Sequence, residues 1–344
     1  GRNYSATLTP EAGIAGGVGI VIDAAGFTDA AGNPNLPAAL GLDDMRFAWA
    51  STWGGSVRDE VNATVLDREG NVYLAGRFSG STAFDRANPT STTSAQGATD
   101  AFVSKFDRTG KFLWARSFGG VGADEIRAVA VSPLGSVVMT GSFSGRVDFD
   151  PGPAVSEISA AGDSDVFVLS LAPSGSLEWA RAIGGTGADT GRGVAVDGDG
   201  FIYVGGGFQG QVDFDPGAGQ RMLGSAGAHD GFVMKLGPTG DFRWAHAIGS
   251  TGSDEIRAMA ADDAGNVYVG GVFSGTVDFD VGAGTRPLVA RGATDGFVAK
   301  YGPVGELSWA LQFGRSGEAG VNALATVADG SVLVAGNYRG EVDA

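Results

Sequence analysis

Pairs of aspartates recur along the chain at a spacing that could build metal sites. The sequence Val147-Asp148-Phe149-Asp150 recurs at 212–215 and at 277–280. Alternate side chains of a strand face the same side, so the two carboxylates of each pair would lie together, opposite the apolar side chains. Carboxylate oxygens are the hard ligands that Ca²⁺ prefers, and Ca²⁺ takes about six to eight oxygens. The sequence therefore predicts calcium sites at Asp148, Asp150, Asp213, Asp215, Asp278 and Asp280.

The same aspartates have a second interpretation, as turn formers and as solvent-facing residues of a half-exposed strand. Aspartate is frequent in turns because its side chain bonds to the backbone two residues further on. Two other sets with the same spacing, one before each expected first strand and one before each expected third strand, favour this interpretation more strongly. The two sets are Asp59, Asp124, Asp189 and Asp254, and Asp100, Asp165, Asp230 and Asp295. For the Val-Asp-Phe-Asp pairs, both interpretations stay open.

Residues for catalysis are few. The two histidines, His229 and His246, occupy different positions in the repeat, and neither lies in a serine or cysteine nucleophile motif. No catalytic triad can be argued from them. The chain has no cysteine, so thiolate chemistry is excluded. We predict that the protein is not an enzyme and that it uses no cofactor other than Ca²⁺.

The tryptophans define the element that positions all of these residues. Five of the six lie at 49, 114, 179, 244 and 309, so the step from one to the next is constant. A fixed period with one aromatic anchor per unit is typical of a repeat architecture. Aromatic residues in repeats can bind sugars, but each of these lies among apolar residues of an expected strand. We therefore expect them to pack between neighbouring units.

Each repeat contains four short stretches with the character of strands. In one unit they are 126–131, 136–143, 166–171 and 176–183, and residues 144–165 form a longer excursion between the second and third. Turns with proline and glycine separate the first two strands and the last two. Sixty glycines and few charged residues also favour short strands and tight turns. Four antiparallel strands per unit, repeated, predict the blades of an all-β propeller. Because neighbouring strands are antiparallel, the excursions and the loops between blades are expected to lie on the same face of the molecule.

The residues themselves resemble a known repeat. The stretches 230–236, 240–244 and 265–271, together with the Phe-Ser-Gly-x-Val-Asp-Phe-Asp blocks, resemble the bacterial SBBP-type β-propeller repeat. The resemblance covers most of the chain, from about residue 45 to the end. It implies a secreted or surface-attached propeller, and it brings no general reaction or ligand with it.

The number of blades follows from the count of strands. Residues 321–326 and 331–338 would start a fifth blade, and residues 45–52 would supply its fourth strand. Such closure of the ring by an N-terminal strand removes exposed sheet edges. The third strand of this blade is not evident, and either residues 18–24 or another molecule would supply it. We predict a five-bladed propeller in residues 42–344, with a larger ring in a longer parent protein as the alternative. The four complete blades are expected at about 56–118, 121–183, 186–248 and 251–313.

Residues 1–41 lie outside the repeat. The stretches 7–13 and 24–33 resemble the C-terminal half of bacterial immunoglobulin-like domains, which occur in tandem in large surface adhesins. Half of such a sandwich cannot bury both of its sheets. We therefore expect residues 1–41 to be a partial immunoglobulin-like β segment or a linker. Either the rest of the domain was removed, or the segment packs on the repeat array or on another chain.

Charge restricts the partners. The net charge is 23 − 39 = −16, which argues against nucleic acid and anionic membranes, because both select basic surfaces. No apolar run is long enough to span a membrane, so no transmembrane segment is expected. Cations and basic partners stay compatible with the sequence.

These observations together predict a non-catalytic structural or adhesion module of an extracellular or cell-surface bacterial protein, including a subunit of a surface filament or matrix. Its expected partners are other proteins, further copies bound through the chain ends, and surface glycans. Two alternatives stay open. One is a quinone-dependent or carbohydrate-active propeller enzyme, and the other is a soluble propeller that binds a sugar or a peptide.

Overall fold

The computed structural model describes residues 57–85, 87, 88, 90–327 and 330–339, together with residue 54 and the backbone of residues 18–23 and 46–52. Every regular element in these ranges is a β-strand. None of them contains a helix that is long and apolar enough to cross a membrane. The all-β class predicted from the sequence is confirmed for the described part of the chain.

Four sheets, which we call blades 1 to 4, have the same order of four antiparallel strands. The first strand of each pairs with the second, the second with the third, and the third with the fourth. The strands of blade 1 are β3 (Glu60–Leu66), β4 (Val72–Phe78), β7 (Asp100–Phe106) and β8 (Phe112–Phe118). Those of blade 2 are β9 (Glu125–Val131), β10 (Val137–Phe143), β13 (Asp165–Leu171) and β14 (Leu177–Ile183). Those of blade 3 are β15 (Thr190–Val196), β16 (Ile202–Phe208), β19 (Asp230–Leu236) and β20 (Phe242–Ile248). Those of blade 4 are β21 (Glu255–Ala261), β22 (Val267–Phe273), β25 (Asp295–Tyr301) and β26 (Leu307–Phe313).

The excursion between the second and third strands of each blade forms a small hairpin of its own. The hairpin strands are β5 (Ser81–Thr82) with β6 (Thr93–Ser94), β11 (Arg146–Asp148) with β12 (Glu157–Ser159), β17 (Gln211–Asp213) with β18 (Met222–Gly224), and β23 (Thr276–Asp278) with β24 (Pro287–Val289).

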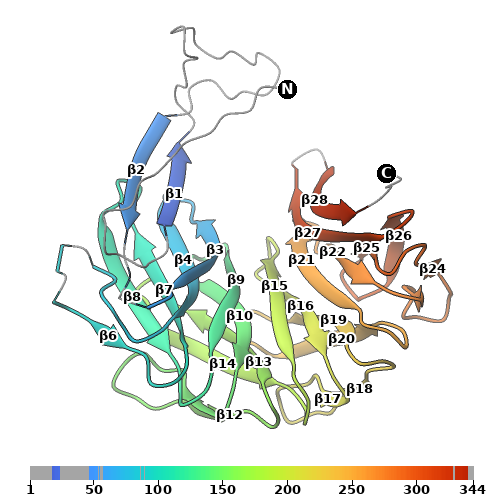
Figure 1. Cartoon of the computed structure of the whole chain (residues 1–344), viewed down its shortest axis with the longest axis horizontal. Coiled ribbons are helices and arrows are strands. Elements are labelled where there is room, and N and C mark those ends of the chain that lie inside the picture. The colour runs from blue at the N-terminus through green and yellow to red at the C-terminus, as the bar shows by residue number, and fades with distance from the viewer. Residues whose placement is uncertain are drawn as a thin grey trace, which may run out of the picture.

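Two-stranded sheets lie at both ends of the repeat. β1 (Val18–Asp23) pairs with β2 (Arg46–Thr52), and β27 (Glu318–Thr326) pairs with β28 (Val332–Arg339). Figure 1 shows the blades following one another around an arc, with the first strands along its inner side and these two sheets at its ends. In the described part of the chain, no strand pairing joins the two sheets.

Apolar side chains explain why the middle strands are so deeply buried. All seven residues of β13, Asp-Val-Phe-Val-Leu-Ser-Leu, are buried, because one face of the blade packs on the preceding blade and the other on the following one. Blades 2, 3 and 4 each place three phenylalanines on the face toward the preceding blade. In blade 2 these are Phe143, Phe149 and Phe167, with ring centroids 5.3–6.5 Å apart. The cores of the protein therefore lie between the blades, and each blade is stabilised by its neighbours.

The structure confirms the four predicted complete repeats and the strand predicted within residues 18–24. That strand is β1, which lies inside the segment predicted to be immunoglobulin-like and pairs with β2. The stretches 7–13 and 24–33, which carry the immunoglobulin-like resemblance, lie outside the described residues.

Candidate functional site

Aspartates in the loops between blades bind two loops together. The carboxylate of Asp124 accepts hydrogen bonds from the backbone amides of Gly120, at 2.9 Å, and Ser144, at 3.0 Å. Asp189 and Asp254 make the same pair of contacts, to residues four positions before and 20 positions after. In this way each carboxylate fixes the blade-to-blade loop to the start of the excursion. This confirms the expectation that the two kinds of loop share one face of the molecule.

These carboxylates are buried, with Asp124 and Asp254 only 1% exposed. Burial raises the pKa of Asp124 to about 6, although the two backbone amides act in the opposite direction. Burial likewise raises the pKa of Asp189 and Asp254. These aspartates bond within their own loop, but to the amide four residues before and not to the one two residues further on that the turn interpretation expects. Solvent exposure was the wrong expectation for this set.

The aspartates that begin the third strands are buried as well. Asp165 accepts a hydrogen bond from the backbone amide of Ala161 at 2.9 Å. Gly184 packs directly over this carboxylate, because a Cβ there would lie 2.1 Å from the carboxyl carbon of Asp165. Burial raises the pKa of Asp165, and also that of Asp100 and Asp230. This second set has a structural role in closing the excursion onto the sheet.

The predicted calcium ligands lie in the excursions, and each pair organises its own loop. Oδ1 of Asp148 accepts from the amides of Asp150 and Ser156, at 3.0 and 2.8 Å, and Oδ1 of Asp150 accepts from Gly152 at 2.6 Å. The copies behave alike. Asp213 and Asp278 each accept two amides, and Asp215 and Asp280 each accept one.

The neighbouring apolar side chains point inward as expected, since Val147 and Phe149 are each 1% exposed. Among the described residues, no group of three or more histidines, aspartates or glutamates is arranged to hold a metal ion. The calcium sites therefore stay a prediction, and the bonds that are present are those of turns.

Three of the repeated tryptophans, Trp114, Trp179 and Trp244, join neighbouring blades. Trp114, on the fourth strand of blade 1, donates a hydrogen bond from Nε1 to the carbonyl oxygen of Pro173 in blade 2, at 3.1 Å. Its ring lies over Gly175, where a Cβ would lie 3.1 Å from the indole. Gly175 also has a φ of +82°, which favours glycine. Arg116 adds a bond from Nε to the carbonyl oxygen of Gly175 at 2.9 Å. The expected packing between units is confirmed, and it includes polar contacts that were not predicted.

Both histidines replace residues of the repeat that have structural contacts. His246 stands where blades 1 and 2 have Arg116 and Arg181, and its ring stacks on Trp244 with centroids 5.0 Å apart. Burial lowers the pKa of His246, and the charge of Arg221 lowers it further. His229 lies 3.0 Å, through Nε2, from the carbonyl oxygen of Ala188. The two rings belong to different contacts and form no common site.

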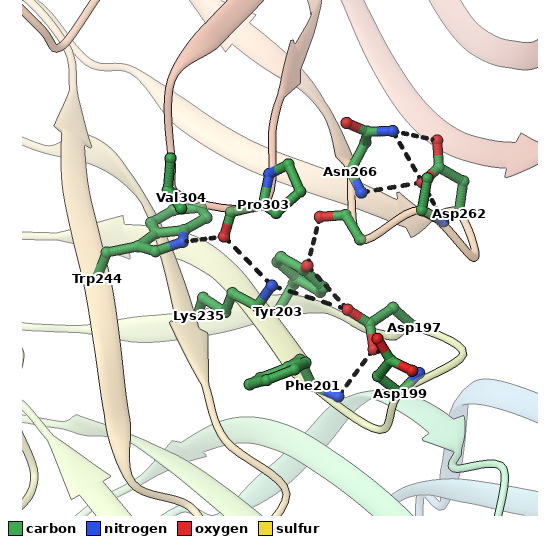
Figure 2. Close-up of polar contacts among 12 residues, drawn as sticks. Asp197, Asp199, Phe201, Tyr203, Lys235, Trp244, Asp262, Asn266, Pro303 and Val304 are labelled. Carbon is green, nitrogen blue, oxygen red and sulfur yellow. Dashed lines mark hydrogen bonds and ion pairs between the residues drawn. The ribbon is translucent and has the colours of Figure 1, made fainter.

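A buried polar network also crosses between blades 3 and 4 (Figure 2). The hydroxyl oxygen of Tyr203 lies 3.0 Å from the carboxylate of Asp197 and 2.6 Å from the carbonyl oxygen of Gly265, and its single proton can be donated to either acceptor. Lys235, only 5% exposed, lies 3.8 Å from Asp197 and donates to the carbonyl oxygen of Pro303 at 3.3 Å. Burial lowers the pKa of Lys235, while the charge of Asp197 raises it. The ammonium is held by partners in two blades, so this network acts as an interblade contact.

A row of residues that the sequence analysis missed lies on the inner side of the arc. Each first strand has an irregularity in its pairing with the second strand, and the residue skipped there is polar in every copy. The signal was available, because these positions follow the same period as the tryptophans. The five residues are Asn62, Arg127, Arg192, Arg257 and Asn322.

Comparisons with known proteins agree with the repeat. Residues 178–206 match the SBBP family model, which describes a beta-propeller repeat. The chain is 24% identical over 262 residues to the uncharacterized WD repeat-containing protein L264 of Acanthamoeba polyphaga mimivirus, across 66% of this chain and 19% of that protein. It is 29% identical over 218 residues to the regulatory protein FlaEY of Caulobacter vibrioides, across 60% of this chain and 22% of that protein. The chain thus spans about a fifth of the length of these curated relatives.

Proposed function

We propose that this chain is a non-catalytic structural and adhesion module of an extracellular or cell-surface bacterial protein, built as a five-bladed ring. The observation that carries the proposal is that the repeated polar side chains make hydrogen bonds within the protein. The aspartates described above bond to loop amides, and the interblade tryptophans and arginines bond to carbonyl groups of the next blade. Side chains that hold loops and neighbouring blades in place build a rigid scaffold. Such a scaffold can present its loops to a partner.

Closure of the ring is supported first by the exposed state of β28. In blades 2 to 4 every residue of the second strand is buried. In β28, which is the second strand of the next unit, seven of the eight residues are exposed. Leu333 is 62% exposed and Val334 is 41% exposed. An apolar strand with an open edge is suited to pairing with another strand.

The backbone of β1 and β2 supplies the matching half of a blade. In blade 2, Ser170 of the third strand pairs with Trp179, and the pairing then skips one residue. In the N-terminal pair, Val21 pairs with Trp49 and the pairing skips one residue at the same place. β1 and β2 therefore correspond to the third and fourth strands, while β27 and β28 correspond to the first and second.

The occupant that we propose for the β28 edge is β1 of the same chain. β2 ends at Thr52 and β3 begins at Glu60, leaving seven residues between them, against six between Phe118 and Glu125. Such a connection places β2 in the blade that precedes β3. A tethered strand also has a high effective concentration, of about millimolar for a short connection. The register of Met139 with Leu169 in blade 2 transfers to a pairing of Val334 with Ile20.

Paired cysteines test this closure, because the chain has no cysteine of its own. The double variant Val334→Cys, Ile20→Cys should form a disulfide within one chain under mild oxidation. It would then run faster than the reduced form on a non-reducing gel. A control with Val334→Cys and Val18→Cys, two residues out of register, should cross-link far less. A ladder of cross-linked chains would show head-to-tail assembly of copies instead, and no cross-link in either variant would reject the pairing.

Accessibility on intact cells tests the proposed location. Bacteria that carry the parent protein would be treated with a protease that does not cross membranes, and this chain would be followed with an antibody. We expect digestion on intact cells, with a cytoplasmic protein as the protected control. Protection until the cells are lysed would contradict a surface or extracellular role.

A further inference from the structure

Three arginines occupy the same irregular position in the first strands of blades 2, 3 and 4. They are Arg127, Arg192 and Arg257, and each is the residue skipped where its first strand pairs with the second. The side chain of a skipped residue does not follow the regular alternation of side chains between the two faces of its strand. Since the first strands lie along the inner side of the arc (Figure 1), the three arginines form a row around its axis.

Contacts at both ends of this row show that its members reach across from blade to blade. Asn62 donates from Nδ2 to the carbonyl oxygen of Ile126 at 2.8 Å, and Arg257 donates from Nη1 to Oδ1 of Asn322 at 3.4 Å. Arg192 forms an ion pair with Glu255, which belongs to the next blade and also binds Arg257 at 2.9 Å. The carboxylate of Glu255 thus forms ion pairs with two guanidinium groups.

Positive charge is in excess at this place, although the whole chain carries −16. Glu125 pairs with Arg127 and with Arg77, the latter at 3.6 Å, and Glu60 pairs with Arg77. Glu60 also pairs with Arg58. Five arginines, at 58, 77, 127, 192 and 257, thus meet three glutamates, at 60, 125 and 255, and 5 − 3 leaves two positive charges among these groups. The nearby Asp124 and its copies direct their oxygens to loop amides instead.

One N–H donor of the arginine row has no hydrogen-bond acceptor in the part of the chain that the structure describes. Nε of Arg127 is buried and has no hydrogen-bond partner among the described residues. Burial lowers the pKa of Arg192, Glu255 raises it, and the charges of Arg127 and Arg257 lower it again, so the guanidinium group of Arg192 lies close enough to those of Arg127 and Arg257 to be repelled by them. The three side chains are still 32–35% exposed, so a solute can reach them.

The opposite end of the same inner surface has a different character. The turns between first and second strands meet there around a cavity of about 170 Å³, whose lining includes three aspartates, Asp67, Asp197 and Asp263, and one arginine, Arg68. Carboxylates outnumber cations in the lining of this cavity, so this end is less favourable for an anion than the arginine row.

We propose that Arg127, Arg192 and Arg257 form a binding site for an oxyanion, a carboxylate or phosphate group of a small ligand, on the inner side of the arc. A guanidinium group offers parallel donors that match two oxygens of such a group. An anion placed between the arginines would accept hydrogen bonds from the solvent-accessible parts of the guanidinium groups and reduce the repulsion around Arg192. This site is independent of the scaffold role proposed above and of the closure of the ring.

Calorimetric titration of the full chain tests the site, with inorganic phosphate in one series and malonate in another, at low salt and in a buffer free of both. We expect saturable binding of at least one anion, weakened by added NaCl. Binding of phosphate alone would identify a phosphate site, and binding of malonate alone a carboxylate site. Arg192→Gln should weaken binding about tenfold. Arg192→Lys should weaken it less, because lysine keeps the positive charge and loses only the two parallel N–H donors of the guanidinium group.

Arg146→Gln is the matched control, since Arg146 is an exposed arginine that pairs with Glu157 in an excursion. It should bind the anion as the unaltered chain does. If Arg192→Gln fails to fold, as judged by circular dichroism, Arg127→Gln replaces it. The proposal is overturned if neither anion gives saturable heat with folded protein, or if the folded arginine variants bind as tightly as the control.

Discussion

Trp179 donates a hydrogen bond from its indole nitrogen to the carbonyl oxygen of Pro238, 59 positions further along the chain, at 3.1 Å. The contact connects the fourth strand of blade 2 to the last turn of blade 3. Gly240 follows in that turn, and a Cβ there would lie 2.8 Å from the indole ring. One side chain therefore fixes the relative position of two blades by both packing and hydrogen bonding.

Removal of this ring should destabilise the protein strongly. We expect Trp179→Ala to lower the free energy of unfolding by about 3 kcal/mol, because both the packing and the hydrogen bond are lost. Denaturant titration would measure the change. A loss below about 1 kcal/mol would show that the ring contributes little to the contact between blades.

Trp309 provides the matched control for this experiment. It lies at the same position of blade 4, but the next sheet, β27–β28, has only two strands in the described part of the chain. No turn between third and fourth strands faces Trp309 there. Trp309→Ala should therefore cost less than half as much as Trp179→Ala. Equal losses would imply either that the indole ring contributes only within its own blade or that, in the proposed closed ring, the segment joining β1 and β2 makes the same contact with Trp309.

Buried aspartates should make stability depend on pH in an unusual direction. Burial raises the pKa of Asp124 from 3.8 to about 6, so between these values the folded state binds more protons than the unfolded state. The stabilising effect is complete below about pH 4 and is lost as the pH rises through 6. The pKa of Asp189 and of Asp254 is raised in the same direction. We expect the contribution of Asp124 to fall by on the order of 2 kcal/mol across this range.

Asp124→Asn tests this contribution, because the amide cannot ionise and still offers one oxygen to the loop amides. The difference in unfolding free energy between the variant and the unaltered chain should shift in favour of the variant from pH 4.5 to pH 7. Denaturant titrations at the two pH values measure it. A difference that does not change with pH would show that Asp124 does not titrate in this range.

These aspartates also show where prediction from the sequence ends. The period of the repeat was sufficient to predict the strands, their antiparallel order and the inward direction of Val147 and Phe149, because apolar alternation and turn residues are local signals. The partner of Asp124 at Ser144 lies 20 residues away. Only the folded excursion brings the two together, and a turn aspartate looks the same in sequence as a buried one.

The arginine row illustrates a different limit. Arg127, Arg192 and Arg257 follow the same period as the tryptophans, so their repetition could have been noticed. Their place on the inner side depends on the irregular pairing of the first strands, and the sequence carries no separate signal for it. The relation of β1 to the third strands was obscured for a similar reason. β1 ends at Asp23 and β2 begins only at Arg46, whereas a short turn joins the third and fourth strands of every complete blade.

Removal of calcium tests the six aspartates of the excursions. If they bind Ca²⁺ in the folded state, a chelator should lower the midpoint of thermal unfolding, and added Ca²⁺ should restore it by mass action. A triple variant in which Asp150, Asp215 and Asp280 are replaced by Asn should no longer respond, while keeping the turn oxygen that accepts the amide of Gly152 and its copies. A midpoint that a chelator leaves unchanged would assign these aspartates to turns alone.

His246 should make the contact between blades 3 and 4 sensitive to acid. Burial lowers its pKa below 6.5 in the folded state, so the unfolded state binds the proton more readily. The stability that depends on the neutral ring is complete above about pH 6.5 and is lost as the pH falls. This direction is opposite to that of the buried aspartates, so the effect has to be measured as a difference between variants.

His246→Arg restores the residue that blades 1 and 2 have at this position. Arg116 and Arg181 donate from Nε to the carbonyl oxygens of Gly175 and Gly240, at 2.9 and 3.3 Å, and an arginine at 246 would face Gly305 in the same way. We expect a gain of about 1 kcal/mol at pH 7, and a larger gain at pH 5.5, because the arginine stays charged in both states. Denaturant titrations at the two pH values measure both gains. An equal gain at pH 5.5 and pH 7 would mean that the pKa of the imidazole is the same in the folded and unfolded states, and a loss at both would mean that the guanidinium group cannot be accommodated beside Trp244.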